Sequence, residues 1–181
     1  GLSVHTLDVS SDDSIADFVL DLGGKPVDLL INNAGVYGAG GSDVGCLSRA
    51  EWRDVLEVNT LSPMMVTQAL LPNLEAGELK IVGMMSSKVG SIADNSSGGS
   101  YYYRSSKTAL NQVVKSLSID LASQGIKVVA LHPGWVQTQR GGPNALIDTQ
   151  QSATGLRAVL AGLDTTGSGC FYSNDGTEVP W

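Results

Sequence analysis

The stretch "VDLLINNAG", residues 27–35, places a short apolar run directly before a cluster of polar and small residues. A run of this length, stopped by Asn and Gly, is typical of a buried β-strand that ends in a turn. Three other apolar runs end in the same way, at Asp8, at Ser86–Ser87 and at "HPGWVQT". The stretch therefore belongs to a repeated pattern, in which each strand ends in residues that can contact a ligand.

Helix-period stretches separate these runs, which is the pattern of a parallel sheet with crossover helices. Ligands bind an open α/β sheet beyond the carboxyl ends of its strands, so the polar clusters are expected to converge on one edge. The expected strands are residues 2–7, 27–31, 80–85 and 127–131, with a fifth near residues 170–172.

The helices are expected where apolar residues recur at intervals of three and four. Ser48 and Glu51 match the S-x-x-E capping box at the start of one helix, and Pro63 is expected to kink or divide that helix. The chain is long enough for one domain with a core, so we expect a single α/β domain over residues 1–181. The other expected helices cover residues 12–22, 101–124 and about 149–163.

The composition argues against several classes of protein. The 181 residues include 11 Lys and Arg against 18 Asp and Glu, a net charge of −7, and no basic cluster suggests a nucleic-acid partner. No apolar run approaches the ~20 residues needed to cross a bilayer, so we expect no membrane partner. Cys46 and Cys170 lack metal-ligand spacing, so no metal site is expected, and the reducing cytoplasm is the expected location.

Candidate acid/base residues stand at the start of the helix that follows "GGS". Tyr103 and Lys107 are four residues apart, so their side chains lie on one face of that helix. A free tyrosine has a pKa of about 10, and a neighbouring ammonium lowers that pKa by favouring the phenolate. A serine at the end of the preceding strand would hold a carbonyl or alcohol oxygen while the tyrosine exchanges its proton.

Six segments that run along nearly the whole chain are similar to one known family. They are "LDV", "INNAG", "EVNT", "SSKVG", "YRSSKTALN" and "PGWVQT". In this order they make the chain resemble a short-chain dehydrogenase/reductase. A narrower similarity, to the C-factor and sniffer-type carbonyl reductase branch, rests on "GSIADNSSGGSYYYRSSKTALN" and the terminal "DGTEVPW".

The resemblance implies catalytic roles for four residues. Tyr103 resembles the proton donor and acceptor, and Lys107 resembles the residue that lowers its pKa and holds the nicotinamide ribose. Ser87 resembles the serine that binds the substrate oxygen, with Ser86 as the neighbouring candidate. Asn59 resembles the asparagine that helps a water and the lysine to form a proton relay.

The resemblance also implies a nicotinamide cofactor, NAD or NADP, with NADP favoured by the carbonyl reductase similarity. Residues after three of the expected strands would contact it: the first group at the adenine, the second at the adenosine ribose and the third at the nicotinamide. Besides Tyr103 and Lys107, the implied residues are Asp8 and Val9; Asn33, Ala34 and Gly35; and Pro133, Gly134, Val136 and Thr138.

Some of these residues have a structural interpretation as well. Asp8 would then cap the following helix, Asn32 and Asn33 would bond the backbone across the sheet, and Asn59 would sit at a helix kink near Pro63.

Other conspicuous side chains are not expected to take part in the chemistry. Tyr101 and Tyr102 are expected to line the substrate mouth or an oligomer contact. Arg104, Trp135 and His132 are expected to be packing or surface residues.

The resemblance further implies a T-G-x-x-x-G-x-G turn, where backbone N–H groups approach the cofactor pyrophosphate, and this motif does not occur in the chain. We therefore expect a Rossmann-like doubly wound parallel sheet without its first two strands and their helices, roughly 40–50 residues. The strand at residues 27–31 would then have an open edge, and the strand at residues 2–7 is expected to move in beside it.

Two functions are consistent with these features. The first is an NAD(P)-dependent oxidoreductase that interconverts a small carbonyl and an alcohol, as a homodimer or homotetramer. The second is a non-catalytic truncated form that only oligomerises with full-length subunits through the helix at residues 101–124.

Overall fold

A four-stranded parallel sheet forms the centre of the protein, with the strands in the order β1-β2-β3-β4. The computed structural model describes residues 1–38, 44–139 and 141–181. Leu29 lies opposite Ile81, and Ile81 lies opposite Lys127, so the strands are in close register. Four of the five predicted strands are therefore confirmed. The strands are β1 (Leu29–Asn32), β2 (Ile81–Met85), β3 (Lys127–His132) and β4 (Phe171–Ser173).

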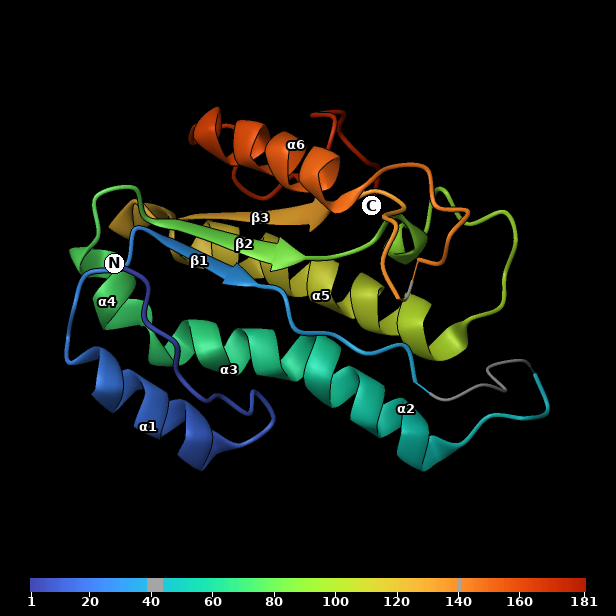
Figure 1. Cartoon of the computed structure of the whole chain (residues 1–181), viewed down its shortest axis with the longest axis horizontal. Coiled ribbons are helices and arrows are strands. Elements are labelled where there is room, and N and C mark those ends of the chain that lie inside the picture. Colours follow the sequence, from blue (N-terminus) through green and yellow to red (C-terminus); the bar gives the residue numbers. More distant parts are fainter. Residues whose placement is uncertain (39–43, 140) are drawn as a thin grey trace.

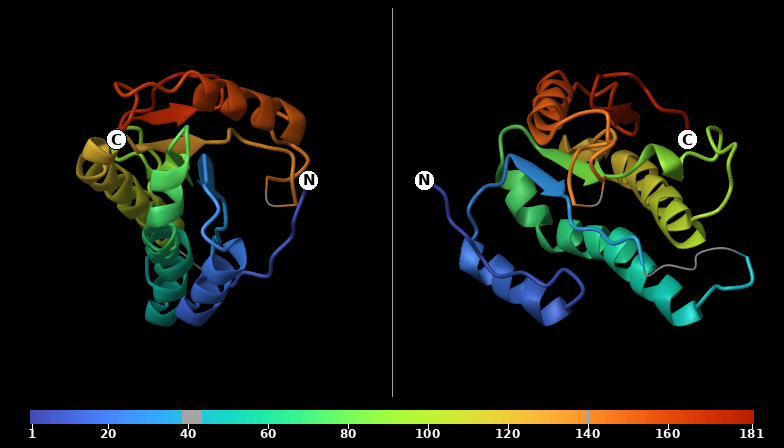
Figure 2. Two further views of the ribbon diagram at one scale, coloured as in Figure 1. Left: turned by 90° about the vertical axis from the view of Figure 1, so that its left-hand side faces the viewer. Right: turned by 45° about the vertical axis from the view of Figure 1, so that its right-hand side comes forward.

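Helices lie on both faces of this sheet (Figure 1). One face carries α6 (Thr149–Ala161), and the opposite side carries the other helices, with α3 and α5 nearest to the strands. The end-on view in Figure 2 shows the sheet between these two layers. The helices of the second layer are α1 (Asp12–Leu22), α2 (Arg49–Leu56), α3 (Ser62–Ala69), α4 (Leu71–Ala76) and α5 (Tyr101–Asp120).

Local sequence signals set where several helices begin and break. The Ser48 hydroxyl accepts a hydrogen bond from the Glu51 N–H at the start of α2, as the S-x-x-E pattern predicts. A π-helical turn, η1 (Glu57–Leu61), separates α2 from α3 just before Pro63. The prediction that this proline divides the helix is confirmed, because proline lacks the N–H needed to continue the preceding hydrogen bonds.

The core follows the alternation of side chains along the strands. Val82 and Met84 of β2 are fully buried against the layer that contains α3 and α5, together with Val114 of α5. Ile81, on the opposite face of β2, packs with Leu160 of α6. The sheet is therefore covered on both faces at β2 and β3, as a parallel sheet requires.

The N-terminal segment corrects one prediction. Residues 2–7 form no strand, Leu2 and Val4 are 94% and 89% exposed, and β1 pairs with β2 alone in the described chain. The segment runs apart from the sheet in Figure 2. His5 contacts Phe18 and Asp21 of α1, so the segment lies along this helix and forms no strand pair with β1. The expected move beside residues 27–31 is therefore wrong.

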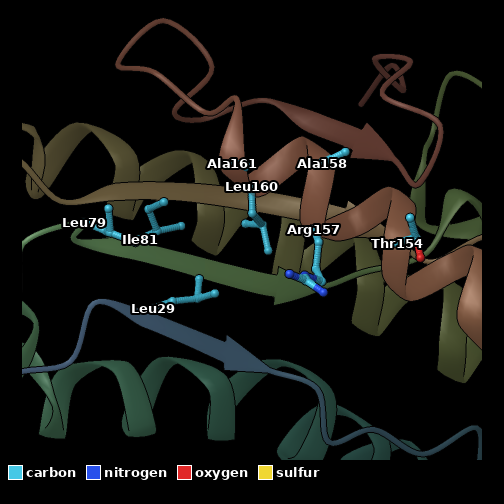
Figure 3. A pocket seen from close by; sticks show the side chains of 8 residues that line it. All are labelled: Leu29, Leu79, Ile81, Thr154, Arg157, Ala158, Leu160 and Ala161. Atoms are coloured by element: carbon cyan, nitrogen blue, oxygen red, sulfur yellow. The ribbon is translucent and has the colours of Figure 1, made fainter.

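The open edge of β1 borders an apolar groove beneath α6 (Figure 3). The groove has a volume of about 570 Å³, and its walls include Leu29, Leu79 and Leu160. Leu29 and Ile31 of β1 are 38% and 42% exposed, because α6 covers β2 and β3 more closely than β1.

No helix in the described parts of the chain is long and apolar enough to cross a membrane.

Candidate active site

A cleft of about 710 Å³ lies at the carboxyl ends of β1, β2 and β3. The loops after these strands, the first turn of α5 and one side of α6 form its walls. The convergence predicted for the polar clusters is therefore confirmed for three strands. The predicted site residues that line the cleft are Asn33, Gly35, Tyr103, Lys107, Pro133, Gly134, Val136 and Thr138, with Ser86 beside them.

Tyr103 and Lys107 lie one helical turn apart at the start of α5. The Lys107 ammonium is 5.6 Å from the centre of the Tyr103 ring, and it donates a hydrogen bond of 2.8 Å to the Met85 carbonyl oxygen. Lys107 is only 3% exposed. A lysine so buried requires hydrogen-bond partners, and its bond to the end of β2 fixes the charge close to the tyrosine.

The two candidate serines differ in their hydrogen bonds. Ser86 is 1% exposed, and its hydroxyl donates a bond of 2.6 Å to the Asn111 side-chain oxygen. Ser87 is half-buried, and in the described part of the chain its hydroxyl has no hydrogen-bond partner. Ser86 lines the cleft but its hydroxyl is already bonded, whereas Ser87 is not among the described residues that line the cleft and its hydroxyl has no bond to break.

A close contact with α5 sets the position of the turn after Ser87. Lys88–Gly90 form a 3₁₀ turn, and an added Cβ at Gly90 would lie 2.7 Å from the Lys107 Cβ. Glycine at this position lets the turn pack directly on the helix that carries Tyr103 and Lys107.

Asn59 joins two walls of the cleft. Its side chain accepts a bond of 2.8 Å from the Val36 N–H, and it donates bonds of 2.8 and 2.9 Å to the Val36 carbonyl oxygen and the Ser106 hydroxyl. Asn59 is fully buried in the π-helical turn. Asn59 therefore sits at the helix break before Pro63, as the structural interpretation expected, and its side chain also joins the loop after β1 to α5.

Gly35 stands between two of the catalytic candidates. A Cβ at this position would lie 3.2 Å from the Asn59 side-chain oxygen and 3.6 Å from the Lys107 ammonium. Glycine therefore leaves space in the cleft beside both groups, which fits the approach of a bound cofactor ribose.

The residues implied to contact the adenosine half of the cofactor do not all line the same cavity. Val9 and Ala34 line a smaller cavity of about 280 Å³, and Asn33 lines both this cavity and the main cleft. Asp8 lines neither of the two; it is exposed and accepts bonds from the Ser10 hydroxyl and N–H. These bonds, the hydroxyl first, hold the pKa of Asp8 below its usual range.

The structural interpretations of Asp8 and Asn32 are both wrong. The cap of α1 is Ser11, whose side chain accepts a bond from the Ser14 N–H, so the capping role proposed for Asp8 is wrong. The Asn32 side chain donates to the Thr67 hydroxyl of α3 rather than to the backbone of the sheet.

The three side chains predicted to pack or to lie at the surface differ in their surroundings. Arg104 donates to the Val89 carbonyl oxygen and the Ser97 hydroxyl, so it ties down the loop before α5. Trp135 is 51% exposed and lines the cleft, with its ring N–H donated to a backbone oxygen. Trp135 is therefore closer to the candidate site than the sequence suggested.

His132, at the end of β3, is held in its neutral form. Its Nδ1 atom is buried without a hydrogen-bond partner in the described residues. Burial and, to a smaller extent, the nearby Lys88 charge lower the pKa of His132 to about 4, and the Asp175 charge opposes this shift. A neutral histidine with this surrounding is a packing residue, as predicted.

The other two tyrosines of the triple stretch are not equivalent. Tyr102 is 2% exposed, its hydroxyl accepts a bond from the Ser48 N–H, and its ring packs against Trp52. The prediction that Tyr102 lines the substrate mouth or an oligomer contact is wrong, because α5 turns this residue toward α2, where it is buried. Tyr101 is exposed at the outer side of α5 and does not line the cleft.

Three residues of this region were not found by sequence reasoning. Asn111 holds the Ser86 hydroxyl, and Ser106 holds the Asn59 side chain. Tyr37 places its ring centre 4.0 Å from that of Tyr103. The motif "YRSSKTALN" contains the first two residues, but only their tertiary contacts give them a role.

In the described chain, no group of three or more His, Cys, Asp or Glu side chains is arranged to hold a metal.

Comparisons with known proteins identify the family. The short chain dehydrogenase family profile matches residues 2–145. The C-signal protein of Myxococcus xanthus is 47% identical over 156 residues, which cover 86% of this chain and 93% of that protein.

Solved structures agree with this assignment. The carbonyl reductase Sniffer of D. melanogaster superposes with a TM-score of 0.92 at 35% identity, over 98% of this chain and 77% of that chain. An NADPH-bound carbonyl reductase from chicken fatty liver gives a TM-score of 0.89 at 32% identity, over 99% and 77% of the two chains. The chain belongs to the short-chain dehydrogenase/reductase family of NAD(P)-dependent oxidoreductases, in the branch of the C-factor and sniffer-type carbonyl reductases.

Proposed function

We propose that this protein interconverts a small carbonyl compound and the corresponding alcohol, with NADP(H) favoured over NAD(H). The observation that carries the proposal is the position of the Tyr103–Lys107 pair. It lies in the same cleft as six of the residues implied to bind the cofactor, and Ser87 follows the strand whose carbonyl oxygen holds Lys107.

The residues of the cleft fit a nicotinamide cofactor. Gly35 leaves room beside Lys107, and Gly134, at φ +85°, forms a tight turn in which a Cβ would lie 2.6 Å from Ile147. Asn33, Gly35 and the segment Pro133–Thr138 would hold the cofactor, and Lys107 would bind its ribose. When bound, the nicotinamide supplies a hydride to the carbonyl carbon or accepts one from the alcohol carbon.

The proton is handled by the side chains of α5 and the turn after β2. In the direction of reduction, the Ser87 hydroxyl donates a hydrogen bond to the carbonyl oxygen, and the Tyr103 hydroxyl transfers its proton to that oxygen. The resulting phenolate is stabilised by the Lys107 ammonium and is protonated again from solvent. Asn59 keeps the loop after β1 and α5 together during these steps.

The test is NADPH oxidation by the purified chain, followed by absorbance, with a panel of small aldehydes and ketones. Formation of one alcohol for each NADPH consumed supports the proposal. A folded chain that binds NADPH but reduces none of the carbonyl compounds contradicts it.

A second candidate function is a non-catalytic role, in which the protein acts only by oligomerising with full-length subunits. The observation in its favour is that one relative has a name, C-signal, that describes a signal and not a reaction.

Cofactor binding separates the two candidates. Calorimetric titration with NADPH is expected to give saturable binding in the micromolar range if the chain is a reductase. The non-catalytic role predicts no measurable binding of NADPH or NADH by a chain whose circular dichroism shows it to be folded.

A further inference from the structure

We infer that Tyr37 determines substrate specificity, by forming a fixed aromatic wall beside Tyr103 that selects carbonyl groups attached to a planar, conjugated ring. The inference rests on the proposed carbonyl–alcohol chemistry and adds a substrate class to it. Tyr37 follows "NNAGV" in the loop after β1, and no role was assigned to it from the sequence.

The Tyr37 ring covers one side of the proton-transfer residue. Its centre lies 4.0 Å from the centre of the Tyr103 ring, with an angle of 35° between the ring planes. Tyr37 is nevertheless 50% exposed, and it lines the same cleft as Tyr103 and Lys107. A substrate whose oxygen reaches Tyr103 therefore brings its neighbouring atoms against the exposed part of Tyr37.

The backbone on both sides of Tyr37 is anchored. Before it, the N–H and the carbonyl oxygen of Val36 are both bonded to the buried Asn59 side chain at 2.8 Å. After it, Gly38 has a φ of +86°, and a Cβ there would lie 3.0 Å from Val55 and 3.2 Å from the Tyr102 ring. The backbone on both sides of Tyr37 is thus held close to η1, α2 and α5, and the Tyr37 ring itself packs on Tyr103, so the wall is present before a substrate enters.

A fixed aromatic wall favours flat substrates for a physical reason. Aromatic rings attract one another through offset-stacked and edge-to-face contacts at centroid distances of about 4.5–7 Å, beyond the effect of the area buried. A saturated ring of similar size has no π-face and is thicker, so it makes neither contact. Trp135 is half-exposed in the same cleft and adds a second aromatic surface.

The test compares benzaldehyde with cyclohexanecarbaldehyde, two aldehydes on six-membered rings that differ in planarity. The ratio of kcat/KM for benzaldehyde over cyclohexanecarbaldehyde is measured for the full chain and for its Tyr37→Ala, Tyr37→Phe and Tyr101→Ala variants. Comparing this ratio between variants cancels the different intrinsic reactivities of the aldehydes. Tyr101→Ala is the matched control, because Tyr101 is also exposed but does not line the cleft.

Tyr37→Ala is expected to lower the ratio about three- to tenfold, the range typical of an aromatic pair. Tyr37→Phe keeps the ring and is expected to stay within about twofold of the wild type, as is Tyr101→Ala. A ratio that Tyr37→Ala leaves within twofold overturns the inference.

Absence of aldehyde reduction by the wild type would contradict the proposed function but would not test the role of Tyr37. If the wild type reduces neither aldehyde, the affinities of benzyl alcohol and cyclohexylmethanol are measured by NMR titration of wild type and Tyr37→Ala. The same three- to tenfold loss of preference supports the wall formed by Tyr37, and equal preference in both proteins overturns it.

Discussion

The two sides of the cleft are built differently. On the α5 side, Lys107 is almost completely buried and bonded to the end of β2, and the equally buried Asn59 of η1 bonds α5 to the loop after β1. On the β1 side, Asn33 is exposed, and Leu29 and Ile31 are more than one third exposed along an edge that pairs with nothing in the described residues. The positions of the proton-transfer residues therefore depend on buried contacts, whereas the residues near β1 lie at the protein surface. Substitutions on the α5 side should therefore change activity and stability more than substitutions on the β1 side.

The largest expected effect is on catalysis at the α5 side. Tyr103→Phe removes the hydroxyl that transfers the proton and is expected to lower kcat about 10²- to 10⁴-fold, with little change in NADPH affinity. Steady-state kinetics and an NADPH titration of the same preparation measure both quantities. Tyr101→Phe is the control and should keep wild-type rates; similar losses in the two variants would remove the distinction between these tyrosines.

The next effect is on stability and compares an asparagine from each side. Asn59→Ala leaves the Val36 N–H and carbonyl oxygen without their partner in a buried place, and is expected to lower the free energy of unfolding by about 2–4 kcal/mol. Asn33→Ala, at an exposed position, should change it by less than about 0.5 kcal/mol. Urea unfolding checks both values, and equal effects would mean that the two sides are not built differently.

A pH effect is expected at the end of β3, which joins the two sides. The pKa of His132 falls from an ordinary 6.5 to about 4 in the folded chain, because burial disfavours the charged ring. Between these pH values the unfolded chain binds more protons, so stability is lost as the pH falls from about 6.5 to about 4.

The size of this loss is expected to be up to about 3 kcal/mol, because a difference of one pKa unit corresponds to about 1.4 kcal/mol. Urea unfolding at several pH values should show a smaller acid-dependent loss in His132→Asn than in the wild type. An unchanged pH dependence in the variant would show that other groups cause the loss.

The smallest effect is expected at the β1 edge. Ile31→Thr, at a position 42% exposed, should change the free energy of unfolding by less than about 0.5 kcal/mol. Val82→Thr is the matched substitution in the fully buried middle of β2 and should cost about 2 kcal/mol, because it buries a hydroxyl. A cost at Ile31 as large as that at Val82 would indicate that the edge of β1 is covered in solution.

The sequence predicted those features that depend on local pattern. Four strands, the start of α2 at Ser48 and the division at Pro63 follow from apolar runs, a capping pattern and the missing N–H of proline. The Tyr103–Lys107 pair follows from helical spacing alone. Each of these signals lies within a few residues of the feature that it determines.

The features that the sequence did not predict depend on contacts between distant segments. Residues 2–7 have a strand-like composition, but a strand needs a neighbour, and the segment contacts α1 instead. Tyr102 is buried because α5 packs against α2, which the tyrosine stretch itself does not encode. The position of Tyr37 depends on Asn59, more than twenty residues further along the chain.

Transfer of deuterium tests the central claim most directly. The chain is incubated with a reducible aldehyde and NADPH that carries deuterium at the transferred position, and the alcohol is analysed by mass spectrometry. The account predicts one deuterium on the carbinol carbon in the wild type and at least a hundredfold slower labelling in Tyr103→Phe, from the usual range for loss of a proton donor. An unlabelled alcohol, or equal labelling rates in the two proteins, would contradict it.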